Sequence, residues 1–241
     1  MAVIYFHKDR GETMGQMMNR FREQYPDHTR ATYAGRLDPL ASGQVVILTE
    51  NDVHHKDTYT NRDKIYEVDI VFGVSSDTYD ALGVVSGVDV GSTLNQNQIV
   101  PILDSYIGDY EQSYPVYSSR TVNGKPLWHY AQQGLLDTIT VPRVLRHIYE
   151  YSYDGVSSAS RDEMIRGLFD DMNRIEGDFR QQQIYDSWQG IQVQLPENLH
   201  IHTLNFTVSS GTYIREIVHR LGQDIGCGAI AMHIRRIGYK D

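Results

Sequence analysis

Two hydrophobic periodicities alternate along this chain, one of two residues and one of helical spacing. Together they require both strands and helices. Every second residue is apolar in 64–73 and again in 204–208, which places those side chains on one side of a pleat. Apolar residues recur at helical spacing in 14–25, 97–108 and 214–225. These patterns predict a mixed fold built from strands and helices.

Residues 150–190 differ in character from the rest of the chain. Ser160 and Glu163 have the spacing of a capping box, and apolar residues then follow at helical spacing as far as Phe179. The flanks, "YDGVSSAS" and "QQQIYDSWQG", are polar. We interpret this stretch as an acidic helical insertion docked on a single domain that spans 1–241, because the chain shows no internal repeat and no low-complexity linker.

The predicted helix at 214–225 has a cation in its first turn. Thr212 is the expected N-cap, so Arg215 falls near the positive end of the helix dipole. That placement costs roughly 0.3 to 1 kcal/mol, which a nearby negative group would offset. The final residues, 231–241, are basic and strand-like.

Composition limits the classes of function. The chain has one cysteine, ten histidines without common zinc spacings, and no apolar run of about 20 residues that would span a bilayer. No metal, no membrane segment and no signal peptide are expected, and the reducing cytoplasm is the expected location. The net charge of −9 argues against indiscriminate nucleic-acid binding, although it leaves room for a local basic groove.

A tight loop carries the most suggestive chemistry. In "GRLDPLASG", residues 35–43, Arg36 and Asp38 precede an apolar, strand-like run. Asp followed by Pro is a common turn former, so the loop alone is compatible with a purely structural role. A catalytic role for the carboxylate needs support from elsewhere in the chain.

Four segments, in order along the chain, supply that support. They are "GRLDPLASGQVVILTE", "DKIYEVDIVFGVSSDTYDALG", "YPVYSSRTVNGKPLWHYAQQG" and "SSGTYIREIVHRLGQDIGCGAIAMHIRRIG". Together they resemble the TruB family of tRNA pseudouridine synthases. The resemblance implies an α+β pseudouridine synthase fold, with a large, mostly antiparallel mixed sheet, flanking helices and a central cleft. It also implies isomerisation of a uridine in structured RNA, at position 55 in the T loop of tRNA.

The resemblance assigns three catalytic residues. Asp38 is the expected nucleophile, and a free aspartate, with a pKa near 3.9, needs no general base at neutral pH. Arg215, from "GTYIR", is the expected counter-ion, since such a pair at about 4 Å interacts by about 4 kcal/mol at an effective dielectric near 20. Tyr66 is expected to stack on the uracil and to assist proton removal from C5. Asp77, Thr78 and Asp80 match an acidic loop that we interpret as ordering the site.

The expected substrate-binding residues lie in or beside the same segments. The hairpin tip "VNGKP" would present Lys125 to RNA. Tyr33 stands where bacterial members of the family have a histidine. The set comprises Lys8, Tyr33, Arg36, Arg120, Lys125, Tyr213 and Arg235. The N-terminal motif departs from the family pattern, with Asp9 in place of a proline and Met14 in place of a serine.

The resemblance implies a monomer that acts on the tRNA T arm, without cofactor or metal. The usual small C-terminal RNA-binding domain is expected to be absent. Two alternatives remain at this point. One is a non-catalytic RNA-binding protein or tRNA chaperone of the same fold. The other is an acid-based hydrolase, which would need a second carboxylate working with Asp38.

Overall fold

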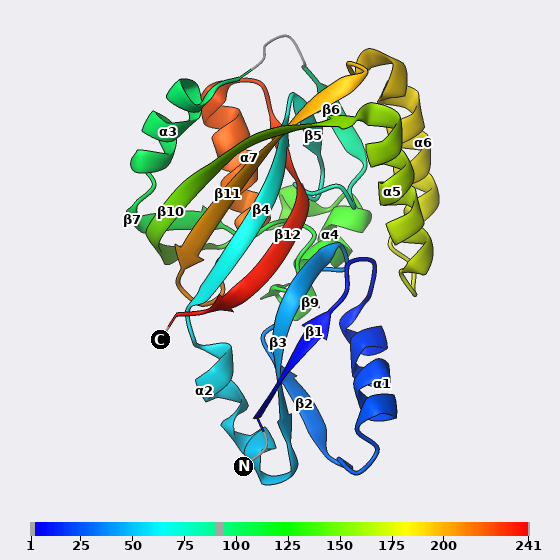
Figure 1. Ribbon diagram of the computed structural model, residues 1–241, viewed down its shortest axis with the longest axis vertical. Coiled ribbons are helices and arrows are strands. Elements are labelled where there is room, and N and C mark those ends of the chain that lie inside the picture. Colours follow the sequence, from blue (N-terminus) through cyan, green and yellow to red (C-terminus); the bar gives the residue numbers. More distant parts are fainter. Residues whose placement is uncertain (1–2, 90–93, 241) are drawn as a thin grey trace.

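One large sheet forms the centre of the computed structural model, which describes residues 3–89 and 94–240 (Figure 1). The expected domain, 1–241, also includes residues 1–2, 90–93 and 241, which lie outside the described part of the chain. The strands run in the order β1-β3-β12-β4-β11-β10-β7, and β2 pairs with β3. Their bounds are β1 Val3–Lys8, β2 Ala31–Ala34, β3 Ala41–Thr49, β4 Lys64–Phe72, β7 Gly108–Ser113, β10 Arg143–Ser160, β11 Asn198–Val208 and β12 Ala229–Tyr239.

Most strand pairs in this sheet are antiparallel, and β3 with β12 is parallel. Two short hairpins form separate two-stranded sheets. They are β5 (Val74–Ser76) with β6 (Val85–Val88), and β8 (Thr121–Val122) with β9 (Lys125–Pro126). The expected α+β fold with a large, mostly antiparallel sheet is therefore confirmed.

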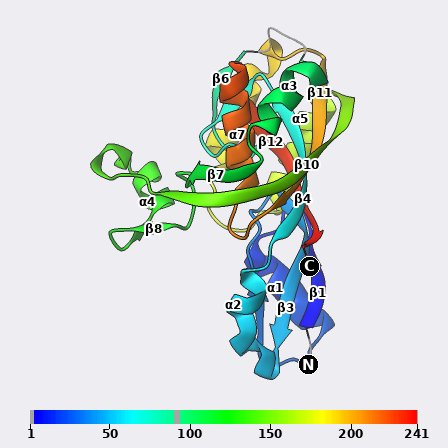
Figure 2. The same ribbon diagram turned by 90° about the vertical axis from the view of Figure 1, so that its left-hand side faces the viewer.

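Helices pack on both faces of the sheet. The main core joins α7 (Ile214–Ile225), α3 (Gln96–Asp104) and α1 (Met14–Gln24) to one face, where Val68, Ile70 and Phe206 are buried. A second core joins α5 (Arg161–Arg174) and α6 (Gln181–Ile191) to the opposite face, through Val71 and Met232. The short helices α2 (Lys56–Thr60) and α4 (Leu127–Gln132) lie toward the periphery (Figures 1 and 2).

Several elements follow directly from the residue pattern. Thr13 caps α1 in a capping box with Gln16, and the apolar stripe of α1 is buried. The even positions of β4 face the main core, as its alternation predicts. The tip between β8 and β9 uses Asn123 at φ 48° and Gly124 at φ 80°, the left-handed conformations expected for such a turn.

Three local expectations were wrong. Tyr213, not Thr212, is the N-cap of α7, because the Thr212 hydroxyl donates to the Ser209 carbonyl instead. The helical insertion expected at about 150–190 does not begin at 150, because residues up to Ser160 complete the long strand β10, whose exposed side chains largely alternate with half-buried ones. The helical stripe that was expected to reach Phe179 is broken, and α5 ends at Arg174.

A long arm extends from the sheet between β7 and β10. Residues 114–142 hold β8, β9 and α4, and Figure 2 shows them projecting well clear of the body. Within the described residues, no helix has the length and apolar character needed to cross a membrane.

Candidate active site

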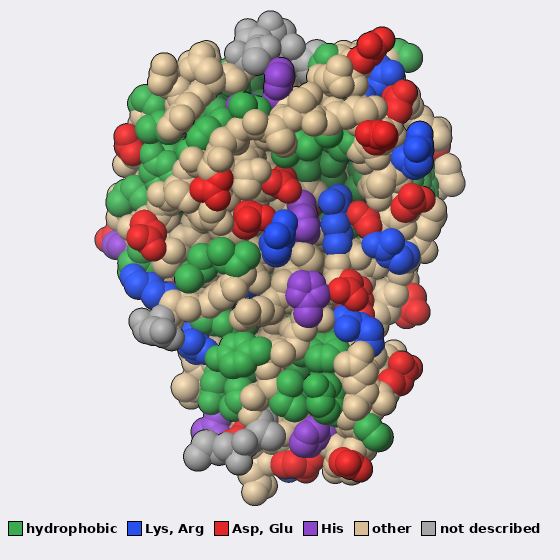
Figure 3. All heavy atoms as spheres, in the orientation of Figure 1, with side chains coloured by type: hydrophobic (Ala, Val, Ile, Leu, Met, Phe, Trp, Pro, Cys, Tyr) green, Lys and Arg blue, Asp and Glu red, His purple; other side chains and the backbone are tan. Residues whose placement is uncertain are grey.

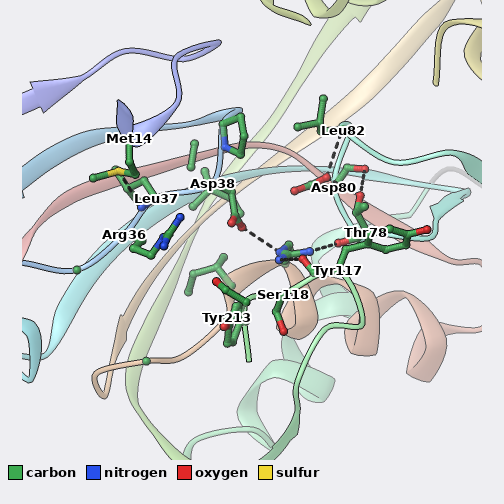
Figure 4. A pocket seen from close by; sticks show the side chains of 18 of the residues that line it. Met14, Arg36, Leu37, Asp38, Thr78, Asp80, Leu82, Tyr117, Ser118 and Tyr213 are labelled. Carbon is green, nitrogen blue, oxygen red and sulfur yellow. Dashed lines mark hydrogen bonds and ion pairs between the residues drawn. The ribbon is translucent and has the colours of Figure 1, made fainter. Parts of the chain in front are cut away.

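A cleft of about 740 Å³ lies where the Asp38 loop, the N-terminus of α7 and the base of the arm meet. Asp38, Tyr66 and Arg215 all line it, so the structure brings the three expected catalytic residues together from distant parts of the chain. Figure 4 shows Asp38 pointing into the cleft between Tyr213 and the loop that carries Thr78 and Asp80.

The Asp38 loop is held from beneath by a buried cation. Lys8 is fully buried, and its Nζ donates to the carbonyls of Asp9, Pro39 and Ala41 at 2.7 to 3.1 Å. Burial lowers the pKa of Lys8 to about 8, against the pull of nearby carboxylates. Lys8 was expected to bind substrate, but here it supports the loop and presents no surface to a ligand.

Close backbone packing fixes the other end of the loop. A Cβ at Gly43 would lie 2.2 Å from the Arg236 carbonyl oxygen, so only glycine fits at this point of the β3–β12 pair. The buried Arg236 donates from Nε to the Gln44 carbonyl at 2.6 Å. Its two terminal nitrogens lie 3.5 Å from the carbonyls of Gly35 and Arg36.

Asp38 and Arg215 form an ion pair across the cleft floor. Nε of Arg215 lies 3.0 Å from Oδ2 of Asp38, and the two side chains are 4% and 43% exposed, respectively. Nε makes no aligned hydrogen bond, so the contact is mainly electrostatic. The other guanidinium nitrogens donate to the carbonyls of Thr78 at 2.8 Å and Tyr117 at 3.0 Å. Arg215 is therefore rigidly held, while one side of Asp38 is open to a ligand.

A second carboxylate lies beyond Arg215. Asp80 is buried, and its Oδ1 accepts hydrogen bonds from the Thr78 hydroxyl at 2.6 Å and the Leu82 amide at 3.0 Å. Burial lowers the pKa of Arg215, but the charges of Asp38 and Asp80 outweigh this effect and raise it overall. The charges of these two acids thus favour the charged form of a guanidinium that is almost wholly buried.

The charge of Asp80 gives stability a measurable pH dependence. Burial raises its pKa from 3.8 to about 6, although Arg215 and the hydrogen bonds from Thr78 and Leu82 oppose the shift. The folded protein therefore binds an extra proton between these values, and stability falls as pH rises through them. Asp80→Asn removes this titration. We expect its unfolding free energy to rise relative to that of the parent by about 2 kcal/mol from pH 4 to pH 7.

Urea denaturation of both proteins at several pH values measures this difference. A constant difference across the range would mean that Asp80 has no raised pKa in the folded protein.

The aromatic residues of the site are fixed by the sheet and by α7. Tyr66 is 7% exposed, lines the cleft, and lies between Phe206 and Arg236 in the register of the sheet. Tyr213 caps α7, and the side chain of Gln112 bonds both its amide and its carbonyl. Burial raises the pKa of Tyr213, and the charge of Asp38 adds to the effect.

The other expected substrate-binding residues divide into four groups, of which Arg235 forms the last. Arg36 lines the cleft. Arg120 and Lys125 are exposed on the arm, with the Arg120 guanidinium 4.9 Å from the ring centre of Tyr114. Tyr33 lies outside the cleft, in a shallow hollow beside α1, and its ring contacts the Lys56 ammonium at 5.3 Å.

Arg235 lies on the far side of the sheet. It alternates with Arg236 along β12 and pairs with Glu67 at 2.7 Å, so it points away from the face that packs on α7. Figure 3 shows that far face, on which basic and acidic side chains are interspersed. The structure thus separates Arg235 from the cleft.

The cleft has the opposite charge balance to the whole chain. Its lining includes six Lys and Arg side chains against three Asp side chains, whereas the chain has a net charge of −9. Among the described residues, no group of three or more His, Cys, Asp or Glu is arranged to hold a metal ion. The local basic groove that the sequence left room for is therefore this cleft.

Several lining residues were not singled out from the sequence, and two of them are in mutual contact. Arg180, from the loop between α5 and α6, and Tyr117, at the base of the arm, contact one another on the cleft wall. Tyr117 was inside a matched segment, but nothing in "GDFRQQQ" marks Arg180 as part of a site. Their contact joins positions 63 residues apart, which local patterns do not reveal.

Solved structures share this fold at low sequence identity. A chain from the "Crystal Structure of a Cbf5-Nop10-Gar1 Complex" superposes with a TM-score of 0.59 and 16% identity, over 98% of this chain and 48% of that one. One from the "Structure of H/ACA RNP bound to a substrate RNA containing 2'-deoxyuridine" gives a TM-score of 0.55 and 15% identity, over 97% and 46%.

Two sequence relatives have a higher identity to this chain than these solved structures do, and both are called "tRNA pseudouridine synthase B". The protein of Serratia proteamaculans (strain 568) is 31% identical over 237 residues, which are 98% of this chain and 61% of the relative. That of Blochmanniella pennsylvanica (strain BPEN) is 27% identical over 98% of this chain and 74% of the relative. The chain thus spans about three-fifths of the length of several relatives.

Residues 22–165, more than half of the chain, match the family described as "TruB family pseudouridylate synthase (N terminal domain)". The chain therefore belongs to the TruB family.

Proposed function

We propose that this protein isomerises uridine to pseudouridine in tRNA, at position 55 of the T loop, with Asp38 as the nucleophile. The proposal rests on one observation above the rest. A half-exposed carboxylate in a cleft lies 3.0 Å from a guanidinium that is itself almost wholly buried. Family membership and the names of the relatives point to the same reaction.

The reaction needs little beyond what the cleft contains. The C1′–N1 glycosidic bond breaks, a C1′–C5 bond forms, C5 loses its proton, and N1 gains one. Asp38 assists by attacking C1′, by adding to the uracil ring or by stabilising a glycal-forming step, and each route needs a charged carboxylate. Arg215 keeps that charge in place, and Tyr66 stacks on the base and takes part in removing the C5 proton.

A uridine must leave the stack to reach Asp38. Flipping it out costs a few kcal/mol, and stacking on aromatic side chains returns roughly 1 to 3 kcal/mol per base. Tyr66 and Tyr213 line the cleft for that purpose, and the basic lining attracts the flanking phosphates. The exposed cations of the arm, Arg120 and Lys125, extend this contact along the T arm.

Unmodified tRNA provides the direct test. The protein is incubated with a tRNA transcript, and pseudouridine is mapped by carbodiimide labelling and primer extension. We expect one new pseudouridine, at position 55, and none in a transcript with cytidine at that position.

The same experiment decides between catalysis and binding alone. If the protein binds tRNA tightly but makes no pseudouridine, it is an RNA-binding protein or tRNA chaperone of the same fold. A product at another uridine would retain the chemistry and overturn the assignment of the T loop.

A further inference from the structure

The loop between α5 and α6 reaches back to the cleft. β10 and β11 are antiparallel neighbours, and the chain between them forms the two helices before it returns to the sheet. The turn between the helices places Asp178, Phe179 and Arg180 in the cleft lining. A connection at the edge of the fold thus supplies part of the wall beside Asp38.

Arg180 grips two other segments of that wall. Its Nη1 and Nη2 donate to the two carboxylate oxygens of Asp77, at 2.6 and 3.1 Å, in a bidentate pair. Nη1 also donates to the Tyr117 hydroxyl at 2.8 Å, and the guanidinium carbon lies 4.0 Å from the centre of the Tyr117 ring. The Arg180 side chain is 14% exposed, so these contacts are largely shielded from water.

Arg215 contacts the same two segments at different atoms. It bonds the carbonyls of Thr78 and Tyr117, while Arg180 bonds the side chains of Asp77 and Tyr117. Two arginines therefore fasten the acidic loop to the base of the arm. Only Arg215 touches Asp38, so Arg180 acts on the ion pair through the segments that both arginines share.

The backbone of Arg180 supports a dedicated role. Arg180 has φ 62°, a left-handed conformation that is uncommon for residues other than glycine and asparagine. Such a conformation persists where surrounding contacts hold it, and it clusters at functional sites. The contacts of Arg180 with Asp77 and Tyr117 are of this kind.

We propose that Arg180 is a positioning residue for the isomerisation proposed above, because it locks the Asp77 loop and Tyr117 around Arg215. It thereby connects the helical pair α5–α6 to the catalytic ion pair and to the base of the arm that contacts RNA. A loose grip lets Arg215 and Asp38 leave their productive geometry, and misplacement of that kind costs up to about 10²-fold in rate.

Two variants of Arg180 test the proposal against a matched control. We expect Arg180→Gln to lower kcat by about tenfold or more with a smaller change in KM for tRNA. Arg180→Lys is expected to restore part of the rate, because an ammonium keeps the positive charge near Asp77 but lacks the planar fork that fits both carboxylate oxygens. Arg166→Gln, on the exposed face of α5, removes the same charge from the same helical pair and is expected to keep the parent's kcat.

Amide hydrogen exchange gives a second readout that does not depend on activity. In Arg180→Gln, exchange is expected to rise in peptides covering 77–84 and 117–128, where the Trp128 amide bonds the Ser118 carbonyl. Parent-like exchange and kcat in Arg180→Gln would overturn the proposal. So would an equal loss in Arg166→Gln. If the parent makes no pseudouridine, the proposed function fails, and the exchange data still decide whether Arg180 fastens the two segments.

Discussion

Asp38→Asn is expected to lower pseudouridine formation by about 10⁴-fold or more, the scale of loss when a nucleophile is removed. The amide keeps the shape of the side chain but is neutral and a poor nucleophile. The loop beneath it is held by Lys8 and by backbone contacts, none of which uses the carboxylate. Binding of tRNA is therefore expected to stay close to that of the parent, and to tighten if loss of the negative charge relieves repulsion of phosphates.

Single-turnover assays with labelled tRNA measure the rate, and filter binding measures the affinity. Asp170→Asn removes the same charge from the exposed surface of α5 and should leave both quantities unchanged. Parent-like isomerisation by Asp38→Asn would end the assignment of Asp38 as nucleophile. A large loss of tRNA binding would instead make Asp38 a binding residue.

Arg215→Met is expected to cost both activity and stability. Removing one partner of a buried ion pair leaves the other uncompensated, which typically costs about 3 to 5 kcal/mol. Here the loss leaves the buried Asp80 without the cation whose charge favours its ionised form, and frees the carbonyls of Thr78 and Tyr117. Isomerisation should fall even at temperatures where the variant is fully folded, because Asp38 loses its fixed counter-charge.

Urea denaturation at pH 7 measures the stability, and Arg235→Met is the matched control. Arg235 also pairs with a carboxylate, but its side chain is 44% exposed, and exposed pairs contribute up to about 1 kcal/mol. If the two variants lose a similar unfolding free energy, the burial of Arg215 does not add to the stability that its ion pair provides. Retained activity in folded Arg215→Met would remove its role as counter-ion.

Local periodicity predicted the elements that depend on local residues. The apolar stripe of α1, the alternation of β4 and the Asn123–Gly124 turn each reflect a pattern within about a dozen positions. The resemblance to a known family went further, because it paired Asp38 with Arg215 across the chain. The structure places these two side chains in contact.

What the sequence could not show depends on tertiary contacts. Arg180 lies in a polar stretch and acquires its role only when folding brings Asp77 beside it, 103 positions away. Lys8 has the character of a surface cation, and its burial follows from three carbonyls that converge on it. The side of the sheet to which Arg235 points depends on the register of β12 with β4. The short basic segment did not define that register.

The position of β12 dictates how the protein can assemble. The last strand of the described chain lies between β3 and β4, which come from the first third of the sequence. During synthesis, the edges of β3 and β4 that later pair with β12 therefore stay unpaired until residues 229–239 have left the ribosome. Unpaired strand edges of this kind promote aggregation. Pairings this distant in sequence form slowly. Closure of the sheet around β12, on which the packing of the Asp38 loop against Arg236 depends, therefore follows the synthesis of nearly all of the described chain.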